Sequence, residues 1–264
     1  MKKHYAYKSP FKMRDKEGVE YTLEIITDNC PQDPRKWSNV CTMVCWHRDY
    51  SLGDKHSYDS VNEFFEDILH NVCGMSYEDV EELPTKEQYK LARENDKIYI
   101  KELNLYDHSG ITISTSNVYP YNDRWDAGCV GFVYVTKEKA LKEWGGIPEK
   151  DENGEFIRIP HEHPDGSVTY STKYTPITEE NWKEVAEYHM NNEVKTYDQY
   201  LRGDVYGFTL TKTVIEQETC PHCGEVIREY EEDEEVDGCW GFFGNSLEDN
   251  GILDYISTDL VFVE

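Results

Sequence analysis

Apolar and polar residues alternate in the first part of the chain in the way expected of β-strands. Residues 19–27 and 40–47 both show this alternation and are rich in β-branched or apolar side chains, so they predict two strands. Residues 60–70 then change to a helical period. Ser60 and Glu63 form a capping box at the start of this predicted helix.

The middle of the chain mixes short helices with strands. Residues 78–82 and 86–93 have helical patterns, and 97–105 and 111–115 predict two strands joined by a turn. The mostly apolar residues 129–135 predict another strand. Later segments follow the same rules: a helix over 136–144, a hairpin within 145–177, a long helix capped by Thr178 and ending near Gly203, and strands over 204–215, 226–231 and 258–263.

The predicted strands come in groups and do not alternate regularly with helices. This order predicts an α+β fold with a mostly antiparallel sheet and several helices. We expect a main domain over residues 1–215, with an inserted β-hairpin at 145–177. An acidic C-terminal region, 216–264, is expected to pack on the same domain.

Negative charge is concentrated toward the C-terminal end. Residues 216–264 contain fifteen acidic side chains and one basic one, whereas the first sixty residues contain nine acidic and ten basic, and the whole chain has a formal charge of −26. Such a surface repels nucleic acid and membrane headgroups, so we expect direct binding to neither. No apolar leader or membrane-spanning run is evident, which favours a soluble intracellular protein.

A concentrated row of carboxylates imitates the phosphates of nucleic acid. Two clusters are the candidate partner-binding residues: Glu231, Glu232, Asp233, Glu234, Glu235 and Asp237, and a second group of Glu78, Asp79, Glu81 and Glu82. A groove built to hold a phosphate backbone would attract either cluster. The alternative is that both are simply solvated, charged surface.

One cysteine motif has the spacing of a metal ligand pair. Cys220 and Cys223 stand in the string Cys-Pro-His-Cys-Gly, whose turn presents two sulfurs to one tetrahedral ion. Cys239 is a candidate third ligand for a structural zinc ion. The fourth ligand stays open, and His222, Cys30 and Cys73 are the candidates for it. The alternative is a turn that bears two reduced thiols.

Catalytic signals are weaker than these binding signals. Walker A, dinucleotide-binding and zincin motifs are all missing from the sequence. His108, Asp126 and Cys129 are the residues that a small zinc-stabilised hydrolase would use, although no neighbouring residue in the sequence activates the thiol. We therefore expect a binding protein in preference to an enzyme.

Several longer strings are distinctive. They are Asp33–Trp37 with Met43–Arg48, Asp107–Thr115, Trp125–Gly128 with Val130–Val135, Tyr197–Phe208, and Cys239–Gly244. Through them the chain resembles a family of uncharacterised proteins from bacteriophages and mobile genetic elements of bacteria, over most of its length outside 145–177. The resemblance implies the cytoplasm of a bacterial host and supplies no catalytic residue.

The charge and the resemblance together suggest a function. We expect a phage or mobile-element accessory protein that inhibits a host nucleic-acid-binding defence protein of the restriction or CRISPR type, with its carboxylates imitating DNA. The alternatives are the zinc-stabilised hydrolase and a phage replication or virion accessory protein.

Overall fold

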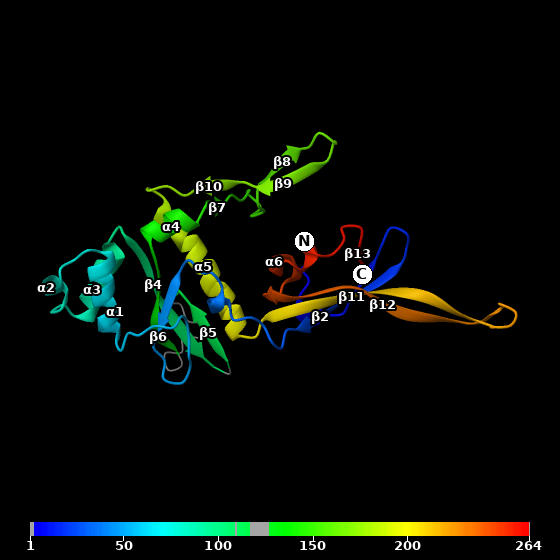
Figure 1. The fold of residues 1–264 in the computed structure, drawn as a ribbon, viewed down its shortest axis with the longest axis horizontal. Coiled ribbons are helices and arrows are strands. Elements are labelled where there is room, and N and C mark those ends of the chain that lie inside the picture. The colour runs from blue at the N-terminus through cyan, green and yellow to red at the C-terminus, as the bar shows by residue number, and fades with distance from the viewer. Residues whose placement is uncertain (1–2, 109, 117–126, 264) are drawn as a thin grey trace. The chain divides into compact units, whose positions relative to one another are not determined.

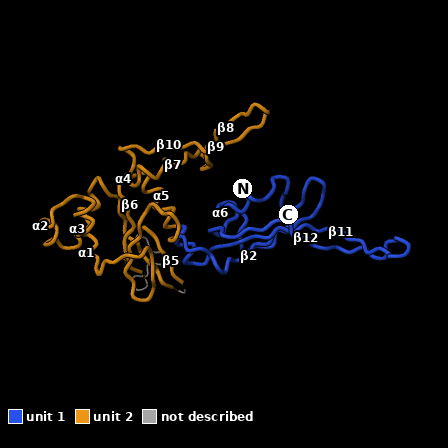
Figure 2. Tube along the Cα trace, in the orientation of Figure 1, with its two compact units in different colours: residues 1–34, 196–264 blue, residues 35–195 orange. Residues whose placement is uncertain are grey.

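The computed structural model describes residues 3–108, 110–116 and 127–263 (Figure 1). It confirms the expected fold class, because the chain is α+β and the paired strands of its sheets are antiparallel. The chain divides into two compact units (Figure 2). Unit 1 contains residues 1–34 and 196–264, and unit 2 contains 35–195. The boundary expected after Ile215 falls within a strand of unit 1.

Unit 1 is built on a five-stranded antiparallel sheet. In spatial order its strands are β12 (Val226–Phe243), β11 (Val205–Thr219), β2 (Glu20–Thr27), β1 (Phe11–Arg14) and β13 (Val261–Phe262). Met13, Leu23 and Phe208 from three of these strands form the core of this unit with Leu247 and Ile252. These last two lie on short helices after the sheet, α6 (Leu247–Asn250) and the 3-10 turn Ile252–Asp254. A further 3-10 turn, Ala6–Lys8, precedes β1.

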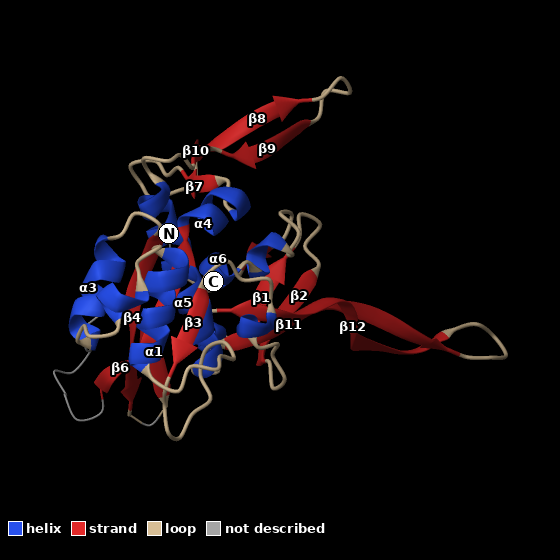
Figure 3. Ribbon diagram, turned by 60° about the vertical axis from the view of Figure 1, so that its left-hand side comes forward, coloured by secondary structure: helices blue, strands red, loops and turns tan. Residues whose placement is uncertain are grey.

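Strands β11 and β12 extend beyond the rest of this sheet. Strand β2 pairs with β11 from Tyr206 to Lys212, whereas β12 pairs with β11 along its full length to Thr219. Residues 213–219 and 226–233 therefore form a two-stranded ribbon without a third strand beside them, which leaves the sheet as a long hairpin (Figure 3). Near the base of the hairpin, Trp240 lies across Gly207, where an added Cβ would come within 2.5 Å of the indole ring.

Unit 2 contains a four-stranded antiparallel sheet. Its order is β3 (Thr42–Cys45), β6 (Ala127–Thr136), β4 (Ile98–Asp107) and β5 (Ile111–Ser114). Strands β4 and β5 form the hairpin that the sequence predicts.

Helices cover both faces of the unit 2 sheet. The α-helices of this part of the chain are α1 (Val61–Asp67), α2 (Tyr77–Val80), α3 (Thr85–Glu94), α4 (Lys137–Glu143) and α5 (Trp182–Leu201), of which α5 continues into unit 1. Phe64 and Phe65 of α1 pack with Ile100 and Phe132 of the sheet. On the other face, Lys101 of β4 forms an ion pair with Glu187 of α5. The apolar side chains of the sheet are thereby buried on both sides.

The helix boundaries follow local capping chemistry. Ser60 accepts a hydrogen bond from the Glu63 N–H (3.1 Å), as the capping box predicts, and α1 continues into a π-helical turn, Ile68–Val72. Thr178 is not the N-cap of α5. Its hydroxyl accepts from the N–H groups of Glu180 and Asn181 in a turn that precedes the helix.

Residues 145–177 contain the expected hairpin. Strands β7 (Gly146–Pro148) and β10 (Tyr174–Pro176) pair at its base, and β8 (Arg158–Glu162) and β9 (Val168–Thr172) form the hairpin itself. The side chains of β8 are exposed throughout.

A buried arginine joins three segments of unit 2. Arg35, in the 3-10 turn Pro34–Lys36, places both Nε and Nη2 on the Asp54 carboxylate (3.0 and 2.7 Å). Its Nη2 also donates to Cys41 O and its Nη1 to Glu193 of α5. The Arg35 side chain is 4% exposed, so the guanidinium is held away from water, whereas its partners Asp54 and Glu193 are partly exposed.

Candidate functional site

The first predicted acidic cluster lies on the outermost strand of the unit 1 sheet. Glu231–Glu235 and Asp237 belong to β12, and every one of them is exposed. The strand continues through the whole acidic run, so the carboxylates alternate between the two faces of the hairpin. Glu229, Glu231, Asp233 and Glu235 point to one face, and Glu232 and Glu234 point to the other.

Strand β11 places no carboxylate opposite these acids. Directly facing pairs from the base of the ribbon outward are Thr211–Glu235, Lys212–Glu234, Thr213–Asp233, Val214–Glu232, Ile215–Glu231, Glu216–Tyr230, Gln217–Glu229 and Glu218–Arg228. Like charges directly opposite each other destabilise antiparallel strands, and this register avoids them. The acids from Glu229 to Glu235 therefore lie along β12 with no carboxylate directly across from them, while Glu216 and Glu218 of β11 face Tyr230 and Arg228.

The carboxylates of this row are not neutralised by ion pairs. Among the described residues, no Lys, Arg or His forms an ion pair with any acidic side chain from Glu229 to Asp237. Their side-chain contacts are with neutral donors, such as Thr213 Oγ1 to Asp233 (2.9 Å) and Gln217 Nε2 to Glu229 (2.6 Å). The full charge of the row faces solvent.

The charge density of this row along the strand is close to that of nucleic acid, although the charges are divided between two faces. A β-strand rises about 3.3 Å per residue, so Glu231–Glu235 carry one charge per ~3.3 Å of strand and one per ~6.6 Å on each face. A single strand of a DNA duplex carries one phosphate per ~3.4 Å of helix axis. Apolar side chains accompany the acids, and Ile215 and Trp240 are 70% and 50% exposed.

The second predicted acidic cluster belongs to unit 2. Glu78 and Asp79 lie in the first turn of α2, and Glu81 and Glu82 follow the helix. All four are exposed, whereas Val80 between them is buried. Ser76 caps this helix and donates to Asp79 (2.6 Å), so Asp79 has a local structural role.

The cysteine motif occupies the tip of the β11–β12 hairpin. Cys220 and Cys223 lie in the turn between the two strands, and backbone N–H groups of His222 and Cys223 point at the Cys220 sulfur. These hydrogen bonds stabilise the thiolate and lower the pKa of Cys220 below its ordinary value. The Cys223 thiol contacts the same sulfur and also lies 3.7 Å from a Glu225 carboxylate oxygen.

The third candidate ligand is not at the tip. Cys239 pairs with Phe208 near the base of the hairpin, thirteen strand residues beyond Val226 and thus ~40 Å from the tip. Throughout the described ranges, no three His, Cys, Asp or Glu side chains gather where they could hold a metal ion. The structure brings Cys220 and Cys223 together and leaves Cys239 apart.

The residues of the hydrolase alternative are also separated. Cys129 pairs with Asn104 of β4. His108 comes four residues after Asn104 in the chain, which corresponds to ~13 Å at the spacing of a strand. Although Cys129 as a residue is exposed, protein atoms crowd its sulfur, and this burial raises the pKa of the thiol. Asp126 lies outside the described residues. The geometry does not assemble an activated nucleophile from His108 and Cys129.

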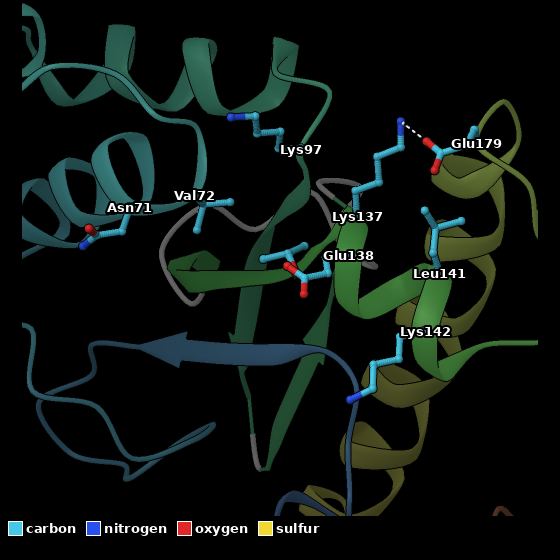
Figure 4. A pocket seen from close by; sticks show the side chains of 9 residues that line it. Asn71, Val72, Lys97, Lys137, Glu138, Leu141, Lys142 and Glu179 are labelled. Carbon is cyan, nitrogen blue, oxygen red and sulfur yellow. Dashed lines mark ion pairs between the residues drawn. The ribbon is translucent and has the colours of Figure 1, made fainter.

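An open cavity of about 700 Å³ lies between the sheet and helices of unit 2 (Figure 4). Its charged lining residues are Lys97, Lys137, Glu138, Lys142 and Glu179. Lys137 points toward Glu179 and forms ion pairs with it and with Asp96, each at 2.8 Å. Neither His108 nor Cys129 lines this cavity.

Comparison of the chain with protein-family models, curated proteins and solved structures finds no match. In the part of the chain that the structure describes, the helices are too short or too polar to cross a membrane. The candidate site is therefore defined by its geometry alone.

The sequence predicts the acids and the cysteine pair of this site. It does not predict the neutral residues of β11, because their positions opposite the acids depend on the register of the hairpin.

Proposed function

We propose that this protein is a non-enzymatic inhibitor that inserts its acidic hairpin into the nucleic-acid-binding groove of another protein. The observation that carries the proposal is the row of exposed, unneutralised carboxylates along β12. A groove that holds a phosphate backbone presents Lys and Arg side chains, and it would bind these carboxylates by the same attraction.

The hairpin also has a shape suited to such a groove. A two-stranded β-ribbon is narrow enough to enter the major groove of DNA, so it also fits clefts that accept one strand of a nucleic acid. The exposed Ile215 and Trp240 side chains add apolar area for the centre of such an interface. Charge would then set the rate and selectivity of association, and these apolar contacts would slow dissociation.

The expected setting narrows the partner class. The resemblance to phage and mobile-element proteins supports a target among host defence proteins, such as a restriction or CRISPR nuclease. The same setting places the protein in the bacterial cytoplasm. The acidic residues of α2 are a second candidate contact within this proposal.

Charge reversal on one face of the hairpin tests the proposal. The variant E231K/D233K/E235K alters exposed side chains that face Ile215, Thr213 and Thr211, so the fold should persist. Expressed in defence-carrying bacteria, the natural protein should raise the plating efficiency of a sensitive phage, and the variant should not. Affinity for the captured target should fall by at least ~100-fold, about 2.7 kcal/mol.

A matched control separates local recognition from total charge. The variant E152K/E155K/E162K makes the same change in net charge at exposed positions of the 145–177 insertion, and it should inhibit normally. The target itself is identified by pull-down from a nuclease-treated lysate, with elution by a salt gradient and competition by duplex DNA. Full inhibition by the hairpin variant, or a target that DNA does not displace, would contradict DNA imitation. Reversal of Glu78, Glu81 and Glu82 tests the second cluster separately.

A further inference from the structure

The tip of the β11–β12 hairpin holds two thiols in one tight turn. The Cys220 N–H donates to Glu225 O (2.7 Å), and the Gly224 N–H donates to Cys220 O (2.9 Å). Gly224 adopts the left-handed conformation that closes the turn, with φ of +74°. The Cys223 thiol lies 3.7 Å from a Glu225 carboxylate oxygen. A Cys-x-x-Cys pair followed by Gly in a tight turn is a common source of two of the thiolates of a structural zinc site.

The turn supplies only half of a zinc site. Structural zinc takes four ligands in a tetrahedron, commonly four thiolates at about 2.3 Å. Cys239 lies ~40 Å along the strand, and no third ligand joins Cys220 and Cys223 within the described part of the chain. Two corners of the tetrahedron are therefore open to ligands from another molecule.

We propose that Cys220 and Cys223 bind one zinc ion together with the same two cysteines of a second copy of the chain, joining two hairpins tip to tip. A two-fold axis through the metal generates the missing pair of thiolates from the pair that is present. The four sulfurs then form a closed Cys₄ site of the structural kind. This proposal does not depend on the inhibitor function.

The hairpin makes this contact sterically and electrostatically accessible. The turn residues from Pro221 to Gly224 are exposed, and the ribbon carries them beyond the last residue that β2 pairs. The continuous acidic run begins at Glu231, ~17 Å of strand beyond Val226. That distance is about twice the Debye length of ~8 Å at physiological ionic strength, so salt screens much of the repulsion between the two acidic rows. Closer to the tip lie the acids Glu216, Glu218, Glu225 and Glu229, and Arg228 faces Glu218.

The test measures mass and metal together on the full chain. The protein is purified with reductant and zinc, its mass is determined by light scattering, and bound zinc is determined by elemental analysis. We expect a dimer with one zinc per two chains, and a twofold fall in mass when EDTA removes the metal. Cobalt in place of zinc should give the visible absorption of a tetrahedral tetrathiolate site.

Substitutions at the tip identify the ligands. C220S and C223S should each be monomeric and zinc-free, with unchanged circular dichroism because both positions lie in a solvent-facing turn. H222Q, E225Q and C239S should keep the zinc and the dimer. One zinc per monomeric chain, a zinc-free chain, or a dimer that survives EDTA or C220S would each overturn the proposal. Loss of zinc in H222Q, E225Q or C239S would overturn the four-cysteine ligand set.

Discussion

At the scale of single residues, two ion pairs of equal length differ in how deeply they are buried. Arg35 to Asp54 and Arg14 to Glu20 both have a shortest N–O distance of 2.7 Å. The Arg35 side chain is 4% exposed, whereas that of Arg14 is 47% exposed. Water screens the Arg14 pair, but Asp54 and Glu193 depend on Arg35 for compensation of their charge.

Replacement of Arg35 should therefore destabilise the protein strongly. Arg35→Met leaves two partly buried carboxylates without their cation, and we expect the free energy of unfolding to fall by about 3–5 kcal/mol. Arg14→Met is the matched control and should cost less than about 1 kcal/mol. Urea denaturation measures both, and equal losses would contradict the structural role assigned to Arg35.

The sequence identified the cysteine pair at the tip but misplaced its third partner. The Cys-x-x-Cys-Gly spacing specifies a local turn, and such chemistry can be predicted from five residues. Cys239 is sixteen residues from Cys223, a separation that allows a compact loop as readily as an extended strand. Whether the loop or the strand forms depends on pairing with β11, and the spacing of the cysteines in the sequence carries no information about that pairing.

At the scale of elements, β12 is the largest departure from the expected pattern. The predicted strand ended at Glu231, but β12 continues to Phe243. Glu and Asp are disfavoured in strands, so local propensity argues against a strand through 231–237. The long register with β11 overrides that propensity, because each acid faces a neutral or basic partner. By contrast, β2, β4 and α1 have strong apolar periods and appear close to their predicted positions.

Backbone amides of the free ribbon should exchange with solvent faster than those of the sheet. A two-stranded ribbon is marginally stable in water, and residues 213–219 and 226–233 have no third strand beside them. We expect exchange at least ~10-fold faster there than in Leu23 and Phe208, a difference of about 1.4 kcal/mol in opening free energy. Hydrogen exchange followed by mass spectrometry measures this in the metal-free protein. Equal protection would show that the ribbon is not an independent unit of opening.

At the scale of the whole molecule, the net charge of −26 makes stability depend on salt. Uncompensated carboxylates repel one another in the folded chain more than in the expanded unfolded chain, and salt screens this repulsion.

The fold class could be predicted from the order of strands and helices alone. The division into two compact units could not be predicted in this way, because residues 1–34 join a C-terminal segment through pairing of β2 with β11.

Raising NaCl from ~10 mM to ~0.5 M should raise the melting temperature of the metal-free protein, since the Debye length falls from about 30 Å to about 4 Å. A gain of ~1 kcal/mol would appear as about 2–4 °C. A variant with Gln at all five positions from 231 to 235 should respond less to salt. An unchanged or falling melting temperature would indicate that favourable ion pairs outweigh the repulsion.

The placement of the acids on the outermost strand has one more consequence. Within the described residues, the far edge of β12 has no strand paired to it, and its free backbone N–H and C=O groups are a template for another chain. The carboxylates oppose pairing of another chain with this edge, because a second copy of β12 added there would bring like charges next to one another. Protonating these side chains in acid would remove the barrier and leave a long, exposed edge open to fibrillar assembly.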